Sequence, residues 1–303
     1  MGGDERAVAV VFPGQGAQAP GLGVPWRDRP EWAVVERAQD LVEADLSALL
    51  LEASADDLRR TDAAQLAVLM ASLIAWESVR AELEPLAATY AGHSLGQITA
   101  LIAAGAVGFE DGLRLAAARA KATQACADAG DHAMAAFLGA SPEIAESACT
   151  GEAWVANDNG GGQVAVAGRA ADVTKSSDRA RELGVKRVIP LAVGGAFHTP
   201  LMAPAAEELR PLLATTSFQS IAVPVVCNTD AEPVTDPAEW PGRLESHLIQ
   251  RVRWRDVMHA VARHGARRVV EVGPGATLTG LFKRERPDLT LDNVFDPTGR
   301  STA

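Results

Sequence analysis

A glycine-flanked turn constrains the fold of this chain more than any other stretch. A short apolar run over residues 86–91 leads into Gly-His-Ser-Leu-Gly at 92–96, and a run with helical apolar spacing follows. This order of strand, tight turn and helix is typical of a nucleophile elbow, where a side chain two residues either side of the serine would clash. It predicts Ser94 at the carboxyl end of a strand, with the next helix aiming its N-terminus at a substrate oxyanion. An ordinary strand-to-helix turn is the alternative.

Composition and net charge exclude one class of partner. The 303 residues are 48% hydrophobic and 22% charged, which is typical of a soluble globular protein with one large domain or two. Asp and Glu number 39 against 28 Lys and Arg, and the formal net charge is -11. The chain therefore lacks the basic excess that neutralises phosphates, and we expect no nucleic acid partner.

The cysteines and the hydropathy pattern indicate a compartment. Cys126, Cys149 and Cys227 are far apart and fit no metal or redox spacing, which suits a reducing environment. Residues 1–6 (MGGDER) show no secretory pattern, and no run approaches the ~18 apolar residues of a membrane span. We expect a cytoplasmic protein that does not bind a membrane.

Strand and helix patterns alternate along most of the chain. Strands are predicted at 7–12, 86–91 and 223–228, a strand-loop-helix at 268–279, and helices at 31–51, 61–84 and 109–127. Thr61 is the predicted N-cap of the second of these helices. The polar tail beyond Asp296 is predicted to be loose.

The pattern changes between residues 128 and 197. Short strands are predicted at 132–139, 154–157, 163–167 and 186–191, with a helix at 170–183. This spacing indicates a small split βαβ-like insert.

A serine hydroxyl needs a base to remove its proton. The sequence has six histidines, and His198 is the best candidate because it lies in a glycine-rich loop, residues 193–202, beyond the insert. The chain order of serine then histidine matches α/β-hydrolases. His93 adjoins Ser94 and is expected to line or support the turn. No acidic residue identifies itself as a third member, which leaves a dyad or an orienting carbonyl.

Five motifs together resemble a known family. They are FPGQGAQ at 12–18, the elbow at 92–96, Arg119, GAFHTPLM at 195–202 and EVGPG at 271–275. In order and spacing they are similar to the malonyl-CoA:acyl carrier protein transacylases of type II fatty acid synthesis and the related polyketide synthase domains. The resemblance spans nearly the whole chain.

The resemblance implies an α/β fold and a ping-pong acyl transfer. An α/β-hydrolase-like large subdomain with a parallel sheet (1–127 and 198–303) would hold an inserted ferredoxin-like small subdomain (128–197). Ser94 would attack malonyl-CoA with His198 as general base, and the N–H groups of Gln15 and Leu95 would form the oxyanion hole. The phosphopantetheine thiol of an acyl carrier protein would then take the malonyl group.

The resemblance also implies roles around the serine. Arg119 would pair with the free malonyl carboxylate, which suits a planar, bidentate cation, and Phe197 would crowd an α-methyl group. A backbone carbonyl, placed at Gln250, would orient His198. Further pocket residues are Gln65, Asn157 and His93.

Two residues near that carbonyl depart from the family pattern. His247 stands where the family usually has glutamine, and Arg251 where it has proline. These changes bear on the loop that orients His198.

The implied partners are malonyl-CoA and an acidic acyl carrier protein. No cofactor of its own, no metal and a monomeric state are expected. Basic residues of the insert could dock the carrier, although exposed surface charge is the simpler interpretation: Arg179, Arg181, Lys186 and Arg187.

Three alternatives remain at this point. They are a discrete polyketide acyltransferase of the same fold, a serine acyl hydrolase using the same dyad, and a catalytically silent module that binds carrier proteins. Arg119 argues against a hydrolase of neutral acyl groups, which needs no buried arginine. The combination of Ser94, His198, Gln15 and Arg119 argues against a silent module.

Overall fold

The elbow belongs to a seven-stranded sheet in the computed structural model, which describes residues 7–302. The strand order is β11-β10-β9-β1-β2-β7-β8. The central pairs from β10 to β7 are parallel, whereas the edge strands β8 and β11 are antiparallel to their neighbours. The strands are β1 (Val8–Phe12), β2 (Ala87–Gly92), β7 (Val225–Val226), β8 (Pro233–Val234), β9 (Arg268–Val272), β10 (Thr290–Asp296) and β11 (Gly299–Thr302).

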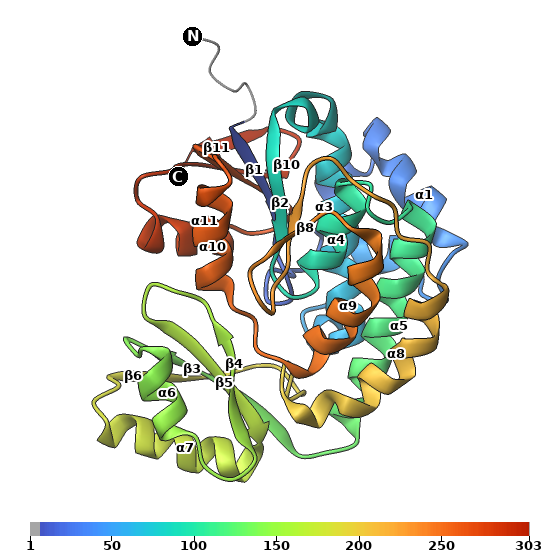
Figure 1. Ribbon diagram of the computed structural model, residues 1–303. Coiled ribbons are helices and arrows are strands. Elements are labelled where there is room, and N and C mark those ends of the chain that lie inside the picture. The colour runs from blue at the N-terminus through green and yellow to red at the C-terminus, as the bar shows by residue number, and fades with distance from the viewer. Residues whose placement is uncertain (1–6, 303) are drawn as a thin grey trace.

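Helices cover both faces of this sheet (Figure 1). They are α1 (Ala33–Gln39), α2 (Leu46–Leu51), α3 (Thr61–Leu83), α4 (Gly96–Ala103), α5 (Phe109–Asp128), α8 (Ala203–Thr215), α9 (Trp240–Ile249), α10 (Trp254–Arg263) and α11 (Thr277–Glu285). Short 3-10 helices span Val24–Trp26, Pro30–Trp32, Asp57–Arg59, Glu84–Leu86, Pro200–Met202 and Pro237–Glu239.

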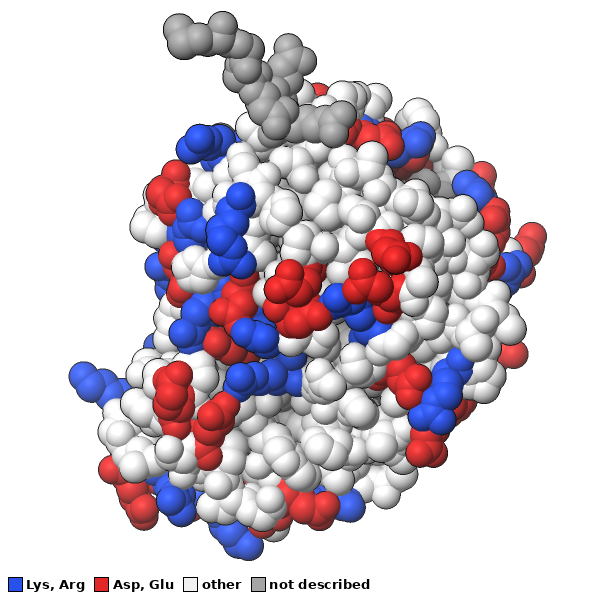
Figure 2. Space-filling view, in the orientation of Figure 1, with Lys and Arg blue, Asp and Glu red and all other residues white. Residues whose placement is uncertain are grey.

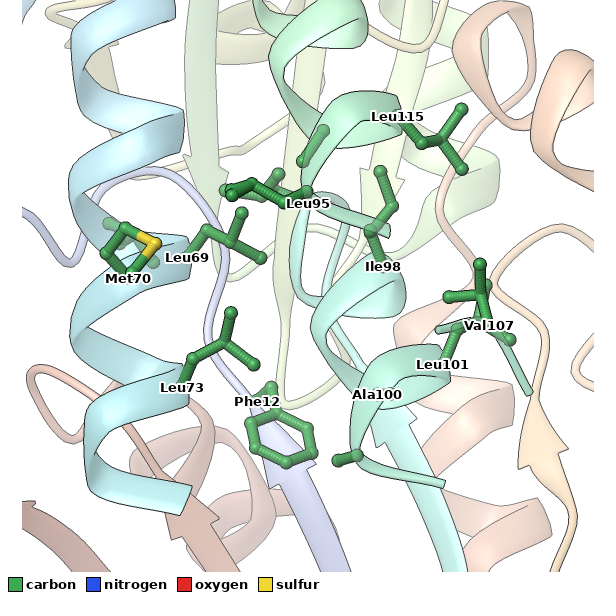
Figure 3. Close-up of a cluster of buried hydrophobic side chains, with 14 of the residues drawn as sticks. Phe12, Leu69, Met70, Leu73, Leu95, Ile98, Ala100, Leu101, Val107 and Leu115 are labelled. Carbon is green, nitrogen blue, oxygen red and sulfur yellow. The ribbon is translucent and has the colours of Figure 1, made fainter. Parts of the chain in front are cut away.

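Strand β1 is apolar throughout because it is buried on both faces, as central parallel strands are. Val10 and Phe12 join the core under α3 and α4, whereas Ala9 and Val11 face α10 and α11. Figure 3 shows the first of these cores, with Leu69 and Leu73 of α3 facing residues of α4 across Phe12. The two-residue period of a strand thus divides one apolar run between two cores.

The insert forms a second sheet with its own core. Its four strands are antiparallel in the order β4-β5-β3-β6. With two helices packed against them, they follow the βαββαβ order of a ferredoxin-like fold. The elements are β3 (His132–Leu138), α6 (Pro142–Ala148), β4 (Ala153–Asp158), β5 (Gln163–Arg169), α7 (Ala170–Glu182) and β6 (Arg187–Leu191). The predicted fold class is confirmed, whereas the subdomain boundaries at 128 and 197 stay a prediction.

A backbone seam joins the small sheet to the large subdomain. Val252, between α9 and α10, donates its N–H to the Ala156 carbonyl (2.9 Å) and accepts from the Asp158 N–H (2.8 Å). Beside the seam, Arg255 forms an ion pair with Asp158 at 2.9 Å. Strand β4 therefore continues its pairing into a segment from outside the insert.

Four predictions about elements need correction or qualification. The predicted helix at 31–51 is two short helices, because residues 40–45 turn between them. Thr61 is the first helical residue, the N-cap is Arg60, and the Thr61 hydroxyl donates to Gln15 Oε1 (2.6 Å). The tail predicted to be loose forms β11, paired with β10. The prediction about residues 1–6 lies outside the described residues.

Candidate active site

The elbow forms as its glycines require. Ser94 has φ 52°, in the left-handed region, between the end of β2 and the start of α4. A Cβ on Gly92 would lie 1.8 Å from the Gly96 carbonyl oxygen, and one on Gly96 would lie 2.3 Å from that of Phe12. Both clashes are with backbone atoms, so rotamer changes cannot relieve them.

This packing makes Gly92 a severe test of the elbow. We expect Gly92→Ala to lower the free energy of unfolding by about 3 kcal/mol or more, because the new methyl meets backbone. The matched control is Gly242→Ala in α9, where a Cβ meets nothing within 4 Å. Alanine there should stabilise the helix by about 0.5–1 kcal/mol. Urea unfolding checks both, and equal stability of the two variants would contradict the steric argument.

Asn228, which follows the neighbouring strand β7 and was not among the predicted site residues, holds the elbow. Its Oδ1 accepts from the Ser94 N–H (2.8 Å), and its Nδ2 donates to the Gly92 carbonyl (2.8 Å). Its own N–H donates to Gln97 Oε1 (2.7 Å). The available signal was a buried polar residue at the carboxyl end of a strand, and β7 does lie beside β2.

His198 reaches Ser94 from the loop ahead of α8. Its Nε2 lies 2.7 Å from Ser94 Oγ, and the residue has φ 60° and is buried. The loop is held by Thr199, whose hydroxyl donates to the Ala196 carbonyl (2.6 Å). The structure therefore brings together the predicted nucleophile and base.

The His198 ring meets two backbone carbonyls, that of His247 and that of Gln250, the residue predicted to orient it. His198 Nδ1 lies 2.8 Å from the His247 carbonyl oxygen. His247 lies in the last turn of α9, where carbonyls lack intrahelical partners. The Gln250 carbonyl makes a smaller contribution to the His198 pKa.

The surroundings of His198 favour a neutral ring. Burial, followed by the positive charge of Arg119, lowers its pKa to about 3, and the His247 carbonyl opposes this shift. A neutral imidazole that donates Nδ1–H to this carbonyl leaves Nε2 free to accept a proton. The geometry thus suits a general base for the Ser94 hydroxyl.

Arg119 of α5 is a buried cation beside the serine. Its Nη2 donates to Ser94 Oγ (3.1 Å), and its Nη1 donates to Gln65 Oε1. Among the described residues no carboxylate forms an ion pair with it. Burial lowers its pKa to about 10, so the side chain remains charged at neutral pH. A buried charge without a counter-ion is costly, so an anion bound beside Arg119 would offset that cost.

Gln65 fixes the direction of that arginine. Its Nε2 donates to Thr123 Oγ1 (2.9 Å) and Thr61 Oγ1 (3.3 Å), which leaves Oε1 to accept from Arg119. Gln65 is fully buried in α3. It therefore lies at the site, as predicted, but contacts Arg119 rather than Ser94.

Two backbone amides lie free at the elbow. A Cβ on Gly14 would lie 2.3 Å from the His93 carbonyl oxygen, so the loop after β1 packs directly on the turn. Within residues 7–302, neither the Gln15 N–H nor the Leu95 N–H has a hydrogen-bond partner. The Leu95 side chain is buried in the core of Figure 3. The oxyanion-hole role predicted for these amides stays a proposal.

The other predicted pocket residues lie around this centre. His93 Nε2 lies 2.8 Å from Asn159 Oδ1, a residue that the sequence analysis did not select, and its ring packs edge-on against Trp254. The Phe197 ring lies against Gly195, where a Cβ would approach it to 2.6 Å. Asn157 is buried in β4, and its side chain makes no described hydrogen bond to Ser94, His198 or Arg119.

The described residues include neither a membrane-spanning helix nor a cluster of metal-binding side chains. No helix among them is long and apolar enough to cross a membrane. No group of three or more His, Cys, Asp and Glu in residues 7–302 is placed to hold a metal ion.

A serine hydroxyl at a strand-to-helix elbow, within hydrogen-bond distance of a histidine, is an arrangement suited to acyl transfer. The chain belongs to the acyl transferase domain family, whose model matches residues 9–287. It is 35% identical to the malonyl CoA-acyl carrier protein transacylase of Bacillus subtilis over 96% of this chain and 94% of the relative. The family resemblance found in the sequence is therefore confirmed.

Solved structures agree. The malonyl-CoA:acyl carrier protein transacylase of Xanthomonas oryzae superposes with a TM-score of 0.90 at 35% identity, covering 96% of this chain and 95% of that one. A malonyl-transacylase solved with a type II polyketide acyl-carrier protein gives a TM-score of 0.91 at 33% identity, over 96% of each chain.

Proposed function

We propose that this protein is a malonyl-CoA:acyl carrier protein malonyltransferase, with Ser94 as nucleophile. One observation carries the choice of acyl group: Arg119, a buried cation without an ion-pair partner among the described residues, donates to Ser94 Oγ at 3.1 Å. A carboxylate bound there would lie beside the acyl carbon under attack. Malonyl supplies that carboxylate, and acetyl does not.

In the first half-reaction, His198 Nε2 accepts the Ser94 proton while Oγ bonds to the thioester carbon. The Gln15 and Leu95 N–H groups stabilise the oxyanion. Collapse breaks the carbon–sulfur bond, and the CoA sulfur leaves with the proton held by His198. The product is a malonyl ester on Ser94.

The second half-reaction runs in reverse with another thiol. The phosphopantetheine thiol of the carrier gives its proton to His198, and its sulfur attacks the ester carbonyl. Ser94 Oγ leaves and takes the proton back from His198. The His247 carbonyl accepts Nδ1–H both while the ring is neutral and while it carries the proton, so the pair works as a dyad without an acidic third member.

The carrier protein would dock at the small subdomain. Figure 2 shows Lys and Arg side chains interspersed with acidic ones on the face where the two subdomains meet. Of the predicted docking residues, Arg179, Lys186 and Arg187 are exposed. Arg181 is exposed but pairs with Asp178 (2.6 Å). Exposed cations would attract the acidic carrier.

Two broader properties follow by inference. The three cysteines are unpaired, which supports a reducing, cytoplasmic location. Fatty acid synthesis is the leading pathway, with a discrete polyketide acyltransferase as the alternative, since one structural relative was solved with a polyketide carrier. A monomeric state and independence from cofactors stay predictions.

Intact-protein mass spectrometry tests the proposal. The protein is incubated in turn with malonyl-, methylmalonyl- and acetyl-CoA, and holo carrier protein is then added. We expect a malonyl adduct that passes to the carrier, with less methylmalonyl adduct because Phe197 crowds the α-methyl group. Steady release of CoA without transfer to the carrier would identify a hydrolase instead.

A further inference from the structure

The side chain of His247 is a second imidazole against the catalytic histidine. Its ring centroid lies 5.0 Å from that of His198, with 32° between the two planes. The same residue accepts His198 Nδ1–H through its carbonyl at 2.8 Å. His247 therefore contacts the His198 ring twice, once through its backbone carbonyl and once through its own tilted ring.

The His247 ring is buried, and neither half-reaction described above uses its side chain. The residue is 2% exposed, and its Nε2 has no hydrogen-bond partner among the described residues. A buried polar atom without a hydrogen-bond partner lowers the stability of the fold, so a smaller apolar side chain at this position would destabilise it less. The ring needs another explanation.

Its surroundings keep this ring neutral. Burial, then the charges of His198, Arg119 and His93, hold the pKa of His247 well below its ordinary value. The acidic residues on elements packed against α9 lie exposed on the outside: Glu207 and Glu208 of α8, and Glu239 of the 3-10 helix before α9. On α9 itself, Glu245 is engaged by Arg210 (2.8 Å).

We propose that the His247 side chain is a positioning residue, a flat neutral surface that covers one face of the His198 ring and keeps water from it. The inference rests on the proposed function, since it treats His198 as the general base. Burial is the first cause of the low pKa of His198. Removing the covering ring would admit water, which stabilises the imidazolium and raises the pKa of His198 toward its ordinary value. The backbone carbonyl would remain in every variant.

Three variants separate shape from charge. His247→Ala opens the face, His247→Phe keeps a flat ring without a titratable nitrogen, and His247→Gln fills the space with a flexible amide. The readout is the His198 Cε1–H signal in proton NMR, followed from pH 8 down to about pH 2.5 so that the titration covers the low pKa of His198, and assigned by its loss in His198→Gln. Circular dichroism reports whether each variant is folded.

We expect His247→Ala to raise the proton affinity of His198 at least tenfold, about one pKa unit, with His247→Phe close to the wild type. His247→Gln should lie between them, and replaces His247→Ala in the comparison should the latter not fold. An unmoved signal in the opened variant, or an equal shift with phenylalanine, would overturn the proposal. The titration needs no substrate, so a failure to form malonyl-enzyme would refute the proposed function without touching this result.

Discussion

Ser94→Ala is expected to take up no malonyl group from malonyl-CoA, whereas the wild-type protein gains one adduct per chain. The alanine has no atom that can bond to the thioester carbon, so the loss should be complete rather than partial. His198→Ala should keep the nucleophile but acylate about 10²–10⁴ times more slowly, because no base at 2.7 Å receives the proton. Rapid-quench mass spectrometry measures both rates.

The control for these variants is integrity of the elbow. Ser94 has a left-handed φ of 52°, which carries a conformational cost for any residue with a Cβ. Alanine should therefore be tolerated at this position to the same extent as serine. Thermal unfolding should place both variants near the wild type. An adduct of equal size and rate on Ser94→Ala would move the nucleophile to another residue.

Arg119→Leu is expected to lower kcat/KM for malonyl-CoA by about 30- to 3,000-fold, the equivalent of about 2–5 kcal/mol. The leucine leaves the malonyl carboxylate buried without a charge partner. Arg119→Lys is the matched variant, since it keeps the charge but loses the planar guanidinium. Its kcat/KM for malonyl-CoA should lie between those of the wild type and Arg119→Leu. The rate of acylation by acetyl-CoA should change far less, because the acetyl group has no carboxylate that could pair with Arg119.

The comparison of the two substrates decides between two roles. Arg119 also donates to Ser94 Oγ, so a general effect on the nucleophile would slow malonyl-CoA and acetyl-CoA equally. Equal loss would therefore exclude carboxylate recognition as the main role of this arginine. Unequal loss would support it.

Local steric rules allowed the centre of the fold to be predicted. The glycines at 92 and 96 are demanded by contacts within the strand-turn-helix unit itself, which is why the pentapeptide was informative. The insert was visible because its strands and helix repeat over a short distance. By contrast β10 and β11 were missed, because β10 (TLDNVFD) carries polar residues in its middle and β11 is polar throughout.

The residues missed at the site depend on tertiary placement. Asn228 acts on the elbow only because β7 pairs with β2, and strand order is not written in either segment. The motif pointed to the Gln250 carbonyl alone, whereas the His247 carbonyl also meets His198 because of where α9 ends. Asn159 meets His93 only across the junction of the two subdomains.

The seam at Val252 sets a rule for building chimeras. Its two hydrogen bonds to Ala156 and Asp158 join backbone atoms only, so they depend on the course of the backbone and not on the identity of the side chains. A ferredoxin-like unit from another family member could therefore replace residues 128–197 and still form these two hydrogen bonds to the large subdomain. The ion pair between Arg255 and Asp158 depends on side chains, and in such a chimera Asp158 would come from the inserted unit and Arg255 from the recipient. Chimeras in which both the arginine and the aspartate are present should fold stably, whereas chimeras that lack one of the two should be less stable.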